Sequence, residues 1–259
     1  MAAPYHGKTG NAQIGLTDMV NLQSWSLNIT NDTSDVTAMG DAWAVTVAGL
    51  KDFSISADGK SQKALDTCAL VGADAELVLG LDTAGPGFTG NAVLTSLTET
   101  VNFESEGTIS WGFDGNEIDG IVYGAATGTA PTASANAFHG KSLIATFATT
   151  PIPMPREWSV SLAAETADTT SGHATTNGRT RLPGVKSGTA TVTAVANGAI
   201  SPAIGTTGAL KLSRSATVGD GAYSGSAICT GTEITVDRSG TSLVKYSFTF
   251  TGAVTIVTA

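Results

Sequence analysis

Short segments of the first half of this sequence recur in the second half, in the same order and at nearly constant spacing. The tripeptide HGK occurs at His6–Lys8 and again at His139–Lys141, an offset of 133 residues. The offset is 133 for Trp25 and Trp158, 135 for Gly49 and Gly184 and for FTGNAVLT and YSGSAICT, and 137 for SWGFDG and SFTFTG. An ordered series with a slowly growing offset indicates a tandem duplication. A period near 133 is too long for a solenoid or propeller blade, so each copy is domain-sized.

The chain length allows two domains of ordinary size, because 259 residues are enough to build two separate cores. The segment Asp119–Phe138 is rich in Gly, Ala, Thr and Ser, and it has no helical or strand period after Tyr123. We therefore predict a first domain at residues 1–120, a linker at 121–135 and a second domain at 136–259.

Alternating apolar and polar residues predict strands in both copies. Trp25–Thr30 alternates strictly, which is typical of a half-buried strand, and Trp43–Val47 predicts a second one with the same pattern. The equivalent segments of the second copy are also rich in Thr, Val and Ile, which strands prefer. Each copy is therefore expected to fold as an antiparallel β-sandwich or barrel.

One segment has a different period. Ser61–Gly72 places Ala64, Leu65, Cys68 and Ala69 at helical spacing, with Ser61 as a possible cap and Gly72 as a possible end. A weaker helix is expected near Ser201–Ala209, where Pro and Gly interrupt the pattern. The predicted fold class is mainly β: two homologous antiparallel sandwich or barrel domains, each with a short flanking helix.

Charge is unevenly distributed between the two copies. The formal net charge is -9, which argues against nucleic-acid binding through a basic surface. Residues 1–133 hold 4 Lys/Arg and 16 Asp/Glu, whereas residues 134–259 hold 9 and 6. No apolar run approaches the roughly 20 residues of a transmembrane helix. The N-terminus has no pattern of a secretory signal, so we expect the protein to be made and first used in a cytoplasm.

Motifs for catalysis or metal binding are missing from the sequence. Cys68 and Cys229 do not match between the copies, so free buried thiols are favoured over a disulfide. The elements around Asp35 and Asp168 (T-x-D-x-T) offer one carboxylate each, which favours an Asp that binds backbone amides in a turn over a metal site. No nucleophile, paired acid or phosphate loop stands in a recognisable setting. We predict no enzyme activity, cofactor or metal.

The first copy contains the segments HGKTGNAQIGLTDMVNLQSWSL, DVTAMGDAW and GLKDFS, in that order. On these segments it resembles the major tail tube proteins of long-tailed (siphovirus-type) bacteriophages, and the resemblance covers about His6 to Gly115. The second copy matches more loosely, because it lacks the second Trp and has TSGHATTNGRTRLPGVKSG in place of the first copy's GD…W…GLKD run.

The resemblance implies a structural virion protein without enzyme activity. Subunits of that family close into rings that stack into a tail tube, through which DNA passes without specific binding. The chain would be assembled in the host cytoplasm and reside in the virion tail. Its partners would be other copies, a tape measure protein, and tail terminator or tip proteins, with no membrane. A duplicated chain would build a pseudo-sixfold ring from three copies. The alternative is a tandem immunoglobulin-like adhesion module.

Several residues follow as candidate contacts in rings or between them. They lie in the two HGK segments and in the polar loops that precede the Gly-aliphatic-Lys turns: Tyr5, His6, Lys8, Asp32, Asp35, Asp41, His139, Lys141, Asp168 and His173. In a ring that alternates first and second copies, acidic and basic units would meet at every lateral contact. The alternative is that these charges lie on solvated outer faces.

Overall fold

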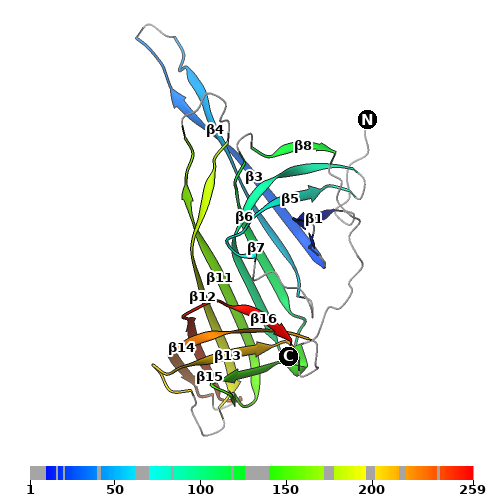
Figure 1. The fold of residues 1–259 in the computed structure, drawn as a ribbon, viewed down its shortest axis with the longest axis vertical. Helices are drawn as coiled ribbons and strands as arrows, with labels where there is room; N and C mark the ends of the chain where they lie inside the picture. The colour runs from blue at the N-terminus through cyan, green and yellow to red at the C-terminus, as the bar shows by residue number, and fades with distance from the viewer. Residues whose placement is uncertain are drawn as a thin grey trace.

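The computed structural model shows an elongated, almost entirely β protein (Figure 1). It describes residues 10–15, 17–19, 21–39, 42–61, 70–82, 85–117, 120–125, 140–171, 178–196, 202–215, 220–237 and 240–258. The first half contains β1 (Asn11–Ile14), β2 (Thr17–Asp18), β3 (Leu22–Asp35), β4 (Thr46–Lys60), β5 (Asp74–Gly80), β6 (Pro86–Asn102), β7 (Thr108–Gly115) and β8 (Val122–Ala125). The second contains the 3-10 turn η3 (Gly140–Ser142), β9 (Ile144–Phe147), β10 (Thr150–Pro151), β11 (Pro155–Asp168), β12 (Arg181–Val195), β13 (Thr207–Ser213), β14 (Gly221–Thr235), β15 (Leu243–Phe250) and β16 (Thr255–Thr258).

The strands of the two halves correspond one to one, and so do their pairings. Every pairing between these strands is antiparallel, so the prediction of a mainly β, antiparallel fold is confirmed. Seven pairings of the first half recur in the second: β1–β2, β1–β5, β3–β4, β4–β7, β5–β6, β6–β7 and β6–β8 correspond to β9–β10, β9–β13, β11–β12, β12–β15, β13–β14, β14–β15 and β14–β16.

Irregularities of the backbone also recur at equivalent positions. The register shift between Leu94 and Ser96 in β6 matches the shift between Cys229 and Gly231 in β14. Asn21 has a positive φ of 59°, and Met154, which lies 133 residues later, has one of 49°. Such a φ is costly for residues other than glycine, so the shared turn is imposed by the shared strand arrangement.

One part of the sequence alignment is wrong by two residues. Trp111 pairs with Ala57 in the first half, and Tyr246 pairs with Val192 at the equivalent place in the second. The last large strands therefore match at an offset of 135, and not at the 137 expected from SWGFDG and SFTFTG. A slip of two residues keeps every side chain on its own face, so alternation alone does not reveal it.

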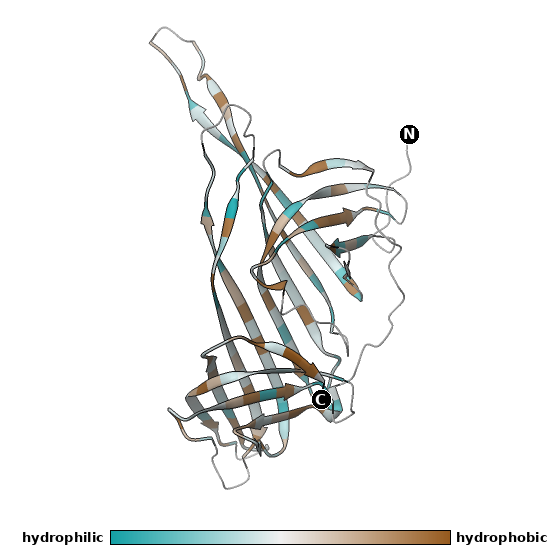
Figure 2. Ribbon diagram, viewed as in Figure 1, coloured by the Kyte–Doolittle hydropathy of each residue, from teal (hydrophilic) through white to brown (hydrophobic). Residues whose placement is uncertain are grey.

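Each half has two groups of strands that cross, with apolar side chains packed between them. Figure 1 shows β13, β14 and β16 crossing the lower ends of β11 and β12. The long strands β6 and β14 belong to both groups, because each pairs with different neighbours along its length. Hydrophobic and hydrophilic segments alternate along the strands in Figure 2. The buried side chains form one cluster that extends through both halves, including Leu94, Leu97, Trp158 and Phe248.

A single strand pairing, β6 with β11, joins the two halves without an equivalent elsewhere among the described strands. Its register runs from Ser96 opposite Ala163 to Asn102 opposite Glu157. We call this contact the inner joint. It makes the strand network continuous from one half to the other.

Of three expectations about local structure, one falls mostly outside the described residues and two are wrong. Most of the predicted helix Ser61–Gly72 lies outside the described residues, and Leu70–Gly72 form a turn. The weaker helix near Ser201–Ala209 is wrong, because Thr207–Ala209 begin β13, where pairing with β14 overrides a weak local signal. Apart from Leu70, which has 3-10 geometry, the only helical turn among the described residues is η3. Trp43–Val47 is also not half-buried: Trp43 is 86% exposed, because this end of the β3–β4 hairpin projects beyond the body (Figure 1).

Candidate functional site at the joint between the halves

Polar side chains on one face of the inner joint reinforce its backbone pairing. The hydroxyls of Thr98 and Ser161, which face each other in the register, lie 3.2 Å apart. The side-chain amide nitrogen of Asn102 donates to the Glu157 carboxylate at 2.8 Å. Directly opposed polar pairs of this kind add to the stability of antiparallel strands.

A buried ion pair crosses the inner joint. Glu99 on β6 and Arg214, which follows β13, are 0% and 1% exposed. Arg214 donates twice to the Glu99 carboxylate, from Nε at 2.7 Å and from an Nη at 2.6 Å. The Tyr223 hydroxyl donates to the same carboxylate at 2.5 Å, and the Ser61 hydroxyl also donates to it. The Arg214 guanidinium lies over the Tyr223 ring, 5.2 Å from its centroid.

The charged form of the Arg214 guanidinium is stabilised by its partners. Burial alone lowers the pKa of Arg214, but the Glu99 charge and the hydrogen bonds from the guanidinium outweigh burial and raise that pKa. Two charges out of water are tolerated only with well-aligned hydrogen bonds on both partners. Removing one partner would leave the other uncompensated, so loss of either residue should destabilise this joint.

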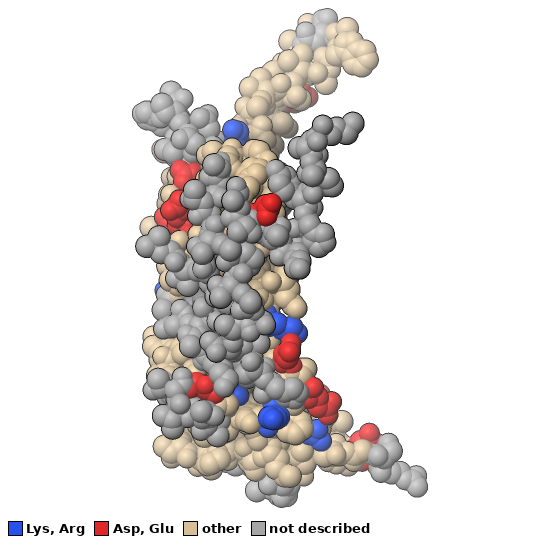
Figure 3. Space-filling model, turned by 90° about the vertical axis from the view of Figure 1, so that its right-hand side faces the viewer, with Lys and Arg blue, Asp and Glu red and all other residues tan. Residues whose placement is uncertain are grey.

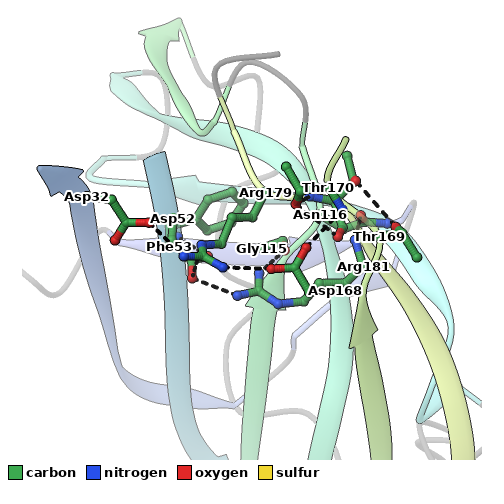
Figure 4. A network of polar contacts seen from close by, with 11 residues as sticks. Asp32, Asp52, Phe53, Gly115, Asn116, Asp168, Thr169, Thr170, Arg179 and Arg181 are labelled. Carbon is green, nitrogen blue, oxygen red and sulfur yellow. Dashed lines mark hydrogen bonds and ion pairs between the residues drawn. The ribbon is translucent and has the colours of Figure 1, made fainter. Parts of the chain in front are cut away.

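A second, more exposed network lies between the base of the β3–β4 hairpin and the start of β12 (Figure 4). Arg179 donates at 2.6 Å both to Asp32 of the first half and to Asp168 of its own half. Its Nε lies 3.7 Å from the Asp52 carboxylate. Its backbone nitrogen donates to the Lys51 carbonyl at 3.0 Å. The network therefore combines ion pairs with a backbone contact between the halves.

Arg181 adds contacts from the first residue of β12. It donates to the Asp52 carboxylate at 2.7 Å and to the Gly115 carbonyl, while its backbone nitrogen donates to the Asn116 side chain at 2.5 Å. All three partners belong to the first half. Hydrogen bonding to Asp52 raises the pKa of Arg181, with burial acting against it and the Asp52 charge adding to it.

Arginines of the second half pair with carboxylates of the first half where the two halves meet. The second half contributes four arginines, each of which forms an ion pair with a carboxylate of the first: Arg156 with Glu104, Arg179 with Asp32 and Asp52, Arg181 with Asp52, and Arg214 with Glu99. Figure 3 shows one side face, where Lys and Arg gather toward the lower end with Asp and Glu beside them. The sequence showed the imbalance but not the partners.

A cavity of about 610 Å³ also lies between the halves. Val71 of the first half and Leu162, Lys186 and Phe250 of the second contribute to its lining. The adjacent Gly72 has a φ of +74°, and a Cβ there would lie 2.8 Å from the Lys186 side chain. The turn at Leu70–Gly72 therefore packs closely over β11 and β12.

The T-x-D-x-T elements form the turns expected of them. The backbone nitrogen of Thr37 donates to Asp35 at 2.8 Å, and that of Thr170 donates to Asp168 at 2.9 Å. Hydrogen bonds from Thr37 lower the pKa of Asp35. Hydrogen bonds from Thr170, with a further contribution from Arg179, lower the pKa of Asp168 to about 2. Among the described residues, no three His, Cys, Asp or Glu side chains gather as metal ligands would.

Only some of the other candidate contact residues lie in the described part of the chain. Asp32 and Asp168 are brought together by Arg179, and Lys141 is exposed in η3. Six candidates lie outside the described residues: Tyr5, His6, Lys8, Asp41, His139 and His173. The residues of the inner joint were not predicted. The charge imbalance between the halves was the one signal that pointed toward them.

Comparisons with known proteins give fold likeness only. No protein-family model matches the sequence, and no curated protein matches it. None of the described helical segments has the length and apolar character needed to cross a membrane. The chain is similar to a component of the virion of a native gene transfer agent particle, with 18% identity and a TM-score of 0.38, over 47% of this chain and 99% of that one. It is also similar to a chain from the tail of an empty gene transfer agent particle with C6 symmetry, with 19% identity and the same TM-score and coverage.

Proposed function

We propose that this chain is a structural subunit of a phage-like tail tube and that it assembles into closed rings, which stack. The observation that carries the proposal is the repeated strand plan: two halves with seven equivalent pairings are joined edge to edge by β6 and β11. A chain built in this way would supply a two-unit segment of a larger ring. The resemblance of His6–Gly115 to tail tube proteins points to the same assembly.

The ring would contain three chains. Two equivalent units in each chain give six units per ring in pseudo-sixfold order, provided that the rotation between neighbouring units closes. The domain limits proposed for these units are residues 1–120 and 136–259, with 121–135 as the linker. The charge pairing at the inner joint supports the alternation of acidic and basic units around such a ring.

The β3–β4 hairpin supports stacking of one ring on the next. Its projecting end carries exposed apolar side chains close together: Val36, Met39, Trp43, Val45 and Val47. Exposed apolar clusters of this kind on a projecting element mark contact sites. In a stacked tube this end would rest on the neighbouring ring. A tape measure protein inside the tube, and terminator or tip proteins at its ends, complete the proposed set of partners in the virion tail.

Negative-stain electron microscopy of the purified chain tests the proposal. We expect hollow rings or tubes with apparent sixfold symmetry and a mass of three chains per ring. The variant Met39→Ser with Trp43→Ser should give rings that do not stack, because both side chains are exposed and their loss leaves the core intact. Particles without a central channel, or stable monomers at all concentrations, would contradict the proposal.

A further inference from the structure

The two strand edges that form the inner joint have equivalents at the two ends of the strand network. Among the described strands, β6 and β11 pair with each other, but the equivalent edges of β14 and β3 pair with no strand. β3 pairs only with β4, and residues of β14 after Cys229 pair only with β15. We call Ser24–Thr30 and Gly231–Asp237 the outer edges.

We infer that the outer edges of two different chains pair with each other, in the register of the inner joint. The inference rests on the proposed ring assembly and names the surface and register by which a second copy binds. Residues of β3 lie 133 positions before their equivalents in β11, and residues of β14 lie 135 positions after their equivalents in β6. The observed pairing of β11 with β6 can therefore be transferred to β3 and β14. Trp158 opposite Val101 becomes Trp25 opposite Val236, and Ser161 opposite Thr98 becomes Asn28 opposite Glu233.

Burial supports this assignment independently of the register. Leu162, Val101 and Val71 are buried at or beside the inner joint, with exposed fractions of 4%, 0% and 2%. Their equivalents at or beside the outer edges are large apolar side chains exposed to water: Ile29 at 49%, Val236 at 79% and Ile204 at 63%. The same strand plan is therefore covered on one side and uncovered on the other, and a second copy carries the surface that fits.

The turn before each crossing strand shows the same contrast. At Gly72, an added Cβ would collide with the Lys186 side chain of the second half. At Gly205, its equivalent, φ is +83° and a Cβ would meet nothing within 4 Å. Both turns keep the left-handed backbone, but only the first has a neighbour to pack against.

The chemistry of the two joints differs at their centres. Glu99 in β6 corresponds to Ile234 in β14, Arg214 corresponds to Leu81, and Tyr223 to Phe88. The charged cluster of the inner joint is thus replaced by Ile234 of one chain facing Leu81 and Phe88 of the next. Each set is complementary to its own partner.

This replacement explains how the order of units is kept. If the β6 edge of one chain met the β3 edge of another, Glu99 would be buried against Leu81 and Phe88 without an arginine. If Ile234 met Arg214, the guanidinium would lose its carboxylate. An unpaired buried charge rejects both wrong joints, so first and second units alternate.

Cysteine cross-linking tests the register in the full-length chain. In a Cys68→Ser background, Asn28→Cys with Glu233→Cys should link chains into covalent dimers and trimers when oxidised or treated with a short bismaleimide. The pair Thr98→Cys with Ser161→Cys, at the equivalent inner positions, should close within each chain and serves as the positive control. Asn28→Cys with Thr232→Cys, whose side chains lie on opposite faces, should not link.

A charge exchange tests the chemistry. Ile234→Glu should weaken association between chains by at least about a hundredfold, because it buries an unpaired carboxylate, while the exposed position leaves the monomer folded. Adding Leu81→Arg and Phe88→Tyr to the same chain copies the inner cluster and should restore assembly. Val122→Glu, an exposed apolar residue of β8 outside the outer edges, is the matched control and should assemble normally.

The outcomes separate this inference from the proposed function. Rings without the Asn28–Glu233 cross-link would overturn the assigned edges and leave the ring proposal standing. Cross-links with Asn28→Cys alone would indicate two identical edges meeting about a twofold axis and would overturn the inference. Monomers that neither assemble nor cross-link would overturn both.

Discussion

Glu99 and Ile234 occupy equivalent places on β6 and β14, yet one is a fully buried carboxylate and the other a half-exposed aliphatic side chain. The backbone around them is the same, including the register shift that follows Leu94 and Cys229. The difference gives the two equivalent edges distinct chemistry. The inner joint contains a hydrogen-bonded ion pair, whereas the proposed contact at the outer edges would bury apolar area.

The variant Glu99→Ile should have the largest effect on stability among the changes considered at the two joints. It makes β6 resemble β14 but leaves the buried Arg214 guanidinium without its carboxylate. We expect a loss of about 3–5 kcal/mol in the free energy of unfolding, measured by urea denaturation. Glu104→Gln, which affects an exposed pair with Arg156 across the same joint, should cost less than about 1 kcal/mol. Equal losses from both variants would contradict the importance of burial.

Replacing the whole cluster should recover most of that loss. The variant Glu99→Ile with Arg214→Leu and Tyr223→Phe carries at the inner joint the residues found at the outer edges. Well-packed apolar residues often equal or exceed a buried ion pair, so the triple variant should unfold within about 1 kcal/mol of the wild type. It should also lose the discrimination between inner and outer partners, visible as irregular assemblies in micrographs. A triple variant as unstable as the single one would show that the two joints are not interchangeable.

The sequence predicted the strands because the alternation of apolar and polar residues is a local pattern. Alternation in Trp25–Thr30 indicates which face of the strand is buried, but it does not indicate whether a neighbouring strand covers the edge. Ile29 was therefore expected on the buried face, and it is 49% exposed. Trp43 shows the same limit, because an alternating pattern is equally compatible with a projecting hairpin. The Glu99–Arg214 pair joins residues 115 positions apart, and nothing local marks either residue as the partner of the other.

A smaller effect is expected at the exposed network of Figure 4. Arg179→Ala removes contacts to Asp32 and Asp168, which are partly solvent-exposed. Screening by water and salt should keep the loss in the free energy of unfolding small, and the loss should shrink further in 1 M NaCl. Thermal unfolding at low and high salt measures it. A loss that is independent of salt would indicate that the backbone contact at Lys51, and not the charges, carries the interaction.

The smallest expected effect is a pH dependence at Asp168. Its pKa of about 2 lies below the ordinary value of 3.8, so its contribution to stability is complete above about pH 4 and is lost as the pH falls through 2. Thr170→Val should raise this pKa, because it removes the hydroxyl that bonds the carboxylate. NMR titration of the Asp168 carboxyl carbon measures the shift, with Asp35 as the internal comparison. An unchanged pKa in the variant would assign the shift to the backbone N–H of Thr170 and to Arg179 instead.

The covalent connection between the halves has a thermodynamic consequence. β8 ends at Ala125 and η3 begins at Gly140, so a short stretch of chain tethers the two surfaces of the inner joint. Short tethers give effective concentrations on the order of millimolar, far above those of free chains in dilute solution. The inner joint should therefore form at any protein concentration, whereas the proposed contacts between chains would require a threshold concentration. A ring of three chains would need three bimolecular contacts where six separate units would need six.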